Sequence, residues 1–85
     1  MKKYDKLFIQ LLYIFHTSAM QALGKVKNPV TNKFDKNFEQ AKQSIDMLEM
    51  IKEKTKNNLS NELSDTLNSF LTEIQMNYVK EINKN

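Results

Sequence analysis

Three carboxylates in the second half of the chain have the residue type and spacing that acid–base chemistry could use. Asp46, Glu49 and Glu53 recur at three- and four-residue intervals, so a helix would place them on one face. A carboxyl group becomes a useful general acid at neutral pH when burial raises its pKa. These three are interspersed with lysines and fall opposite the apolar positions. We therefore expect a solvated, salt-bridged face and no catalytic residue there.

His16 is the only histidine, and its ring could act as a pH-responsive contact group. It falls on the apolar side of the helix expected over residues 3–23, where it could equally be a core side chain that hydrogen-bonds a neighbour. For catalysis it lacks a nucleophile and an orienting carboxylate nearby in that helix. One histidine and no cysteine are too few ligands for the usual zinc site. The sequence thus predicts no enzyme, no metal and no cofactor.

Lysines gather around the only proline in the chain. This basic cluster consists of Lys25, Lys27, Lys33 and Lys36, around Asn28 and Pro29. A net charge of +3 and a local cluster of this kind could bind an acidic partner or an RNA backbone. However, the chain has no arginine for bidentate phosphate contacts, and no aromatic residues alternate with the lysines for base stacking. A solvated loop, a loop that docks onto a protein, and a nucleic-acid site all remain open.

The segment 3–23 is the element around which the rest of the chain must be arranged. Its apolar residues are Leu7, Phe8, Ile9, Leu11, Leu12, Tyr13, Ile14, Phe15, Ala19, Met20, Ala22 and Leu23. On a helix they cover about 260° of the circumference, so neighbouring helices must enclose most of it. The uninterrupted apolar stretch within this segment is about half as long as a helix that spans a bilayer. We expect a core helix and no membrane span.

The connection after this helix carries clear stop and start signals. Gly24, the only glycine, is expected to end the first helix in the left-handed conformation. Pro29 disfavours helix in the residue before it, which predicts a loop over 24–35. Asp35 is expected to cap the start of a second helix over about 36–56.

A third helix is expected over about 61–82, with Ser60 as its N-cap. Asn57 should end the second helix, because asparagine tolerates a positive φ better than most residues. Both connections are short enough to favour antiparallel neighbours. The sequence therefore predicts a small all-α domain of three helices over residues 1–85, with the first helix in the centre.

The expected first helix has more apolar circumference than two helices of ordinary amphipathicity can cover, which is about 200°. Monomers rarely leave a large contiguous apolar patch open to water. We therefore predict a homo-oligomer, or docking onto another protein, through this helix. The expected contact residues are Phe8, Leu12, Phe15, His16, Leu23 and Met50. The absence of cysteine is compatible with the cytoplasm, where we expect the protein.

The chain resembles a family of short bacterial proteins known as domain of unknown function eighteen forty-four. The matching residues are Leu23-Gly24, Asn28-Pro29, Ala41-Lys42, Ile45 to Met50, Lys52 to Thr55, Asn58-Leu59 and, in the third helix, Tyr78. Asn57 replaces a usual glycine and Leu63 a frequent acidic residue. The resemblance covers nearly the whole chain and supports the helical fold, but it implies no activity.

Overall fold

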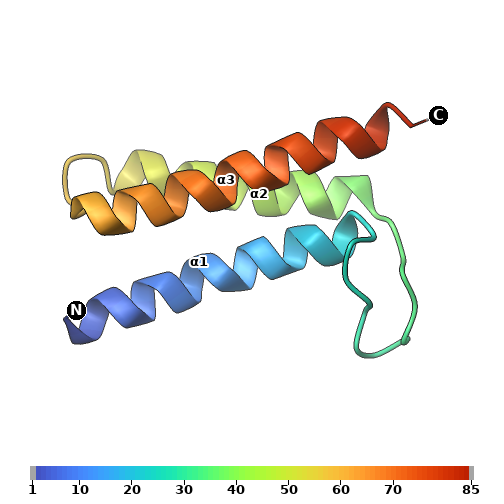
Figure 1. The fold of residues 1–85 in the computed structure, drawn as a ribbon, viewed down its shortest axis with the longest axis horizontal. Coiled ribbons are helices and arrows are strands. Elements are labelled where there is room, and N and C mark those ends of the chain that lie inside the picture. The colour runs from blue at the N-terminus through green and yellow to red at the C-terminus, as the bar shows by residue number, and fades with distance from the viewer. Residues whose placement is uncertain (1, 85) are drawn as a thin grey trace.

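Three helices make up the fold, and each packs against the other two. The computed structural model describes residues 2–84; Met1 and Asn85, the ends of the expected 1–85 domain, lie outside them. The helices are α1 (Lys3–Ala22), α2 (Phe38–Lys54) and α3 (Asn61–Ile82). Figure 1 shows α2 antiparallel to both α1 and α3. The predicted all-α class with three helices is confirmed.

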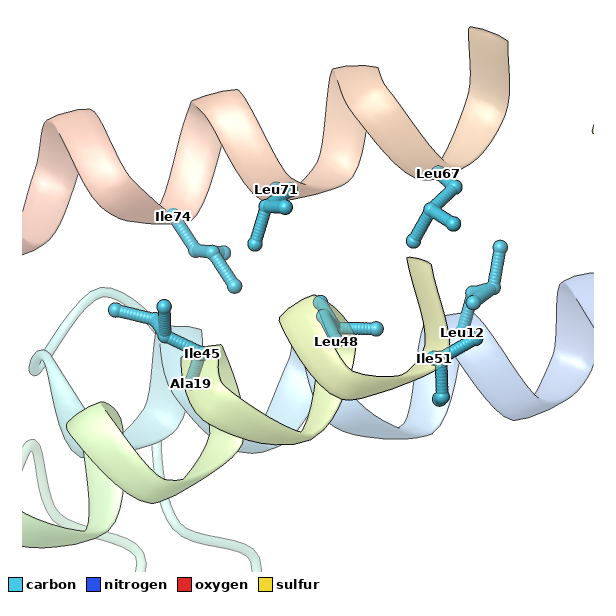
Figure 2. Close-up of a cluster of buried hydrophobic side chains, with 8 residues drawn as sticks. All are labelled: Leu12, Ala19, Ile45, Leu48, Ile51, Leu67, Leu71 and Ile74. Carbon is cyan, nitrogen blue, oxygen red and sulfur yellow. The ribbon is translucent and has the colours of Figure 1, made fainter. Parts of the chain in front are cut away.

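One apolar cluster lies where the three helices meet, and all three contribute to it. Its buried members are Leu12, Ala19, Ile45, Leu48, Ile51, Leu67, Leu71 and Ile74. In Figure 2 these side chains point into the space between the helices. Burying one such aliphatic side chain contributes about 1.5–3 kcal/mol. The cluster therefore holds α1 against the α2–α3 hairpin.

Local backbone signals set the helix ends largely as expected. Gly24 and Asn57 both have positive φ, 76° and 69°, at the two connections. The Ser60 side chain accepts a hydrogen bond from the backbone N–H of Leu63 at 3.2 Å, which caps the start of α3. These three predictions are confirmed.

The start of α2 differs from the expectation. Asn37, not Asp35, is the N-cap, and its Oδ1 accepts a hydrogen bond from the backbone N–H of Gln40 at 3.0 Å. The Asp35 carboxylate instead accepts a hydrogen bond from the Thr31 hydroxyl at 3.2 Å. The loop thus engages the side chain that was expected to cap the helix, and α2 begins at Phe38, two residues later than predicted.

The connection between α1 and α2 is tied back onto α1. The backbone N–H of Asn37 donates to the carbonyl of Ala22 at 2.7 Å, and Leu23 and Lys36 form an isolated antiparallel bridge. Within the loop, Asn28 accepts a hydrogen bond from the backbone N–H of Val30 at 2.8 Å, which forms an Asx turn. These bonds fix the direction in which the chain enters α2.

Candidate interaction surface

One side of α1 exposes a line of large apolar residues. Tyr4, Leu7, Leu11 and Ile14 follow one another at intervals of three, four and three residues, so they lie along one side of the helix. Between 41% and 75% of each residue's surface is exposed. We call these four residues the α1 stripe. Leu12 and Ala19 of the same helix, by contrast, have no exposed surface.

Methionines of α2 extend the apolar surface beside α1. Met47 and Phe15 line the same hollow between α1 and α2, together with Gln43 and Glu39. Met50 lies one turn further along α2 than Met47 and is exposed. The exposed face shared by α1 and α2 is therefore apolar along the stripe and at the methionines, and polar at the start of α2.

The contact residues expected from the sequence have different surroundings. Leu12 and Leu23 have no exposed surface, so their assignment to a contact with a partner is wrong: both are core residues of this chain. Phe8 and Phe15 are half-buried and pack against the core cluster. Met50 is exposed, and its role in a contact stays a prediction. The helical period defined a broad apolar arc but not which part of it α2 and α3 would cover.

His16 lies at the contact between α1 and α3, away from the α1 stripe. Its Nε2 is 2.6 Å from Oε1 of Glu73, and its ring centroid is 4.6 Å from that of Phe70. The ring of Tyr13 is stacked with the His16 ring at a centroid distance of 6.1 Å and lies 6.3 Å from the ring of Phe70. The histidine therefore makes a hydrogen bond and aromatic contacts that join two helices of the same chain.

Two lysines of the basic cluster contact a buried carboxylate near the end of α3. Glu81 is only 2% exposed, and its oxygens lie 2.7 Å from Lys25 Nζ, 2.8 Å from Lys36 Nζ and 2.8 Å from Lys84 Nζ. Hydrogen bonds from Lys25, Lys36 and Lys84, in that order, hold the pKa of the Glu81 carboxyl well below its ordinary value. This group of four residues, which we call the Glu81 cluster, anchors the loop to α3.

The other residues of the basic cluster lie on the exposed part of the loop. The Nζ of Lys27 lies 5.7 Å from the ring centroid of Phe34, a cation–π contact. Lys33 and Pro29 are exposed, while Asn28 is half-buried through its turn. The structure thus divides the predicted loop site, because Lys25 and Lys36 neutralise an internal charge and the remaining lysines face solvent.

The three carboxylates of α2 do not converge. Asp46 pairs with Lys42 at 2.6 Å, and Glu49 accepts a hydrogen bond from Gln75 of α3 at 2.7 Å. Both carboxylates and Glu53 are exposed. Over residues 2–84, no three His, Asp or Glu side chains gather as a group that could hold a metal ion. None of the helices described there is long and apolar enough to cross a bilayer.

Sequence reasoning missed two features that the structure brings out. Leu7, Leu11 and Ile14 belong to the apolar arc expected from the sequence, but Tyr4 does not, and the line that the four residues form was not singled out. Glu81 carried no signal, because its partners Lys25 and Lys36 are more than forty residues away in sequence. Only the packing of the loop on α3 brings them together.

Comparison with known proteins identifies a family but no activity. No curated protein and no solved structure matches the chain. The family model described as Domain of unknown function (DUF1844) matches residues 5–80, which include all of α2 and most of α1 and α3. The chain therefore belongs to the DUF1844 family.

Proposed function

We propose that this protein works by contact and not by catalysis, as a helical interaction and assembly protein that docks through the α1 stripe. The observation that carries the proposal is the exposure of Tyr4, Leu7, Leu11 and Ile14 on one side of a helix that also supplies core residues. Contiguous exposed apolar surface on a small protein is typical of a binding site. Met50, exposed on the neighbouring helix α2, has the flexible, polarisable side chain that suits an adaptable contact.

The alternative is a small basic factor that binds RNA or a ribonucleoprotein through the loop between Lys25 and Lys36. The Glu81 cluster weighs against it, because these two lysines already contact a carboxylate of their own chain. Lys27 and Lys33 remain on the surface of the loop. A phosphate backbone is usually bound by more positive charges than these two.

A co-purification experiment tests the proposed function. The tagged chain is isolated from its host together with bound proteins, in parallel with a stripe variant, Leu11→Gln with Ile14→Gln, and a control, Met76→Gln. Met76 is exposed on α3, outside the stripe. We expect the stripe variant to lose proteins that the wild type and the control both retain, whether these are further copies of the chain or other proteins.

The same experiment can contradict the proposal. Circular dichroism first establishes that all three chains have the same helicity, which is expected because Ile14 and Met76 are mostly exposed and Leu11 is 41% exposed. If the stripe variant then retains every bound protein, the α1 stripe is not the contact surface. Loss of the bound proteins in moderate salt from all three chains alike would favour the RNA alternative.

A further inference from the structure

We propose that the partner covering the α1 stripe is a second copy of this chain, packed antiparallel about a two-fold axis that passes near Leu11. This inference rests on the proposed function and names the partner of the same surface. The layout of the stripe, the charged residues at its ends and the area of the face favour this partner.

The stripe is self-complementary when it is reversed. Leu7 and Ile14 lie at nearly equal distances on either side of Leu11 along α1, so an antiparallel copy places Leu7 against the partner's Ile14. The axis then brings Leu11 against the partner's Leu11, and Tyr4 faces the end of the partner's α1 near the partner's Ser18. A two-fold contact of this kind uses the same patch on both copies.

Charged side chains of opposite sign lie at the two ends of α2, Glu39 in its first turn and Lys54 in its last. Lys3 begins α1, and Lys54 ends the antiparallel α2, so both lie at the same end of the face (Figure 1). At the other end, exposed Glu39 lines the hollow beside Phe15 and Ser18. An antiparallel copy brings Lys3 and Lys54 of one chain toward Glu39 of the other, whereas a parallel copy opposes like charges at these positions.

The face is large enough for a specific dimer of small subunits. The 20 residues of α1 extend about 30 Å at 1.5 Å per residue, and two adjacent helices are about 20 Å wide. The projected area is about 600 Å², and the accessible area of a face with protruding side chains is larger. Standard interfaces bury about 800 Å² per partner. The face shared by α1 and α2 is therefore of sufficient size.

Cysteine cross-linking tests the arrangement, and the chain has no cysteine of its own to interfere. Full-length Leu7→Cys and Ile14→Cys variants are oxidised mildly, each alone and as an equal mixture. Ser69→Cys on the exposed side of α3 is the control for random collision. We expect the mixture to form several-fold more covalent dimer than either variant alone or the control, because a disulfide requires Cα atoms within about 7 Å.

Each outcome decides the proposal. Preferred linkage within Leu7→Cys alone and within Ile14→Cys alone would show a parallel arrangement and overturn the antiparallel one. Linkage no greater than that of Ser69→Cys would overturn the second copy altogether. If the stripe variant still loses other bound proteins in the co-purification experiment, the proposed docking function survives that result, so the two failures are distinguishable.

A charge exchange provides a second, independent measurement. Glu39→Lys should reduce dimer formation, because it places positive charges at both ends of the face. Adding Lys54→Glu to Glu39→Lys restores charges of opposite sign at positions 39 and 54 and should recover the lost dimer. Recovery supports the antiparallel pairing, whereas a double variant that dimerises no better than Glu39→Lys contradicts it.

Discussion

Replacement of Ile14 by glutamine should weaken the dimer strongly while leaving the fold of each chain intact. Ile14 is 61% exposed in one chain, and the proposed contact covers it in both copies. Burying an isoleucine fully is worth about 1.5–3 kcal/mol, so covering this fraction twice is worth about 2–4 kcal/mol. At about 1.4 kcal/mol for each factor of ten, the dissociation constant should rise by about 30-fold to about 700-fold. Desolvation of the glutamine amide adds to the loss.

Sedimentation equilibrium of the wild type, Ile14→Gln and Met76→Gln measures this change. Met76 is the matched control, because it is 67% exposed on α3 and loses a similar amount of apolar surface. We expect its dissociation constant to equal that of the wild type. The reasoning is refuted if Ile14→Gln dimerises as tightly as the wild type, or if both variants weaken the dimer equally. Equal helicity in circular dichroism shows that each chain is folded.

Three further predictions concern the stability of the fold, measured by urea denaturation. The pKa of Glu81 is lowered on folding, so the ionised carboxylate contributes to the free energy of unfolding above its ordinary pKa of 4.5, and this contribution declines as pH falls below it. The difference in stability between wild type and Glu81→Gln should therefore narrow between pH 7 and pH 3. A difference that stays constant would contradict the ion pairing. Gly24→Ala should lower the free energy of unfolding by about 1–2 kcal/mol, because φ is 76° and the new Cβ would lie 3.1 Å from Lys36 Cγ. An unchanged free energy of unfolding would contradict this backbone strain. Leu48→Ala should cost about 3–5 kcal/mol, because Leu48 has no exposed surface, and a loss below about 1 kcal/mol would mean that the core differs from this description.

Features that depend on a few neighbouring residues could be predicted from the sequence. The left-handed Gly24 and Asn57 and the Ser60 cap follow from backbone sterics and from one side-chain hydrogen bond within the same turn. The exception was Asp35, whose carboxylate binds the hydroxyl of Thr31 four residues earlier in the loop. Two suitable caps two residues apart compete, and the loop conformation decides between Asp35 and Asn37.

Features that depend on packing could be predicted only in part. The breadth of the apolar arc on α1 was readable, but Leu12 and Leu23 differ from Leu7 and Leu11 only in which of them the hairpin covers. The docking side of a helix is a tertiary property, and the helical period does not contain it. Glu81 shows the same limit, since nothing near it in sequence indicates that a loop more than forty residues away supplies its lysines.

The mass of the full chain in solution tests the central claim, that a second copy covers the α1 stripe, most directly. Light scattering is measured from low to high micromolar concentration, at low and at high salt. We predict a mass approaching twice the 10.0 kDa of one chain as concentration rises, and a dimer that persists at high salt because its centre is apolar. A mass of one chain throughout the range, in both salts, would contradict the claim.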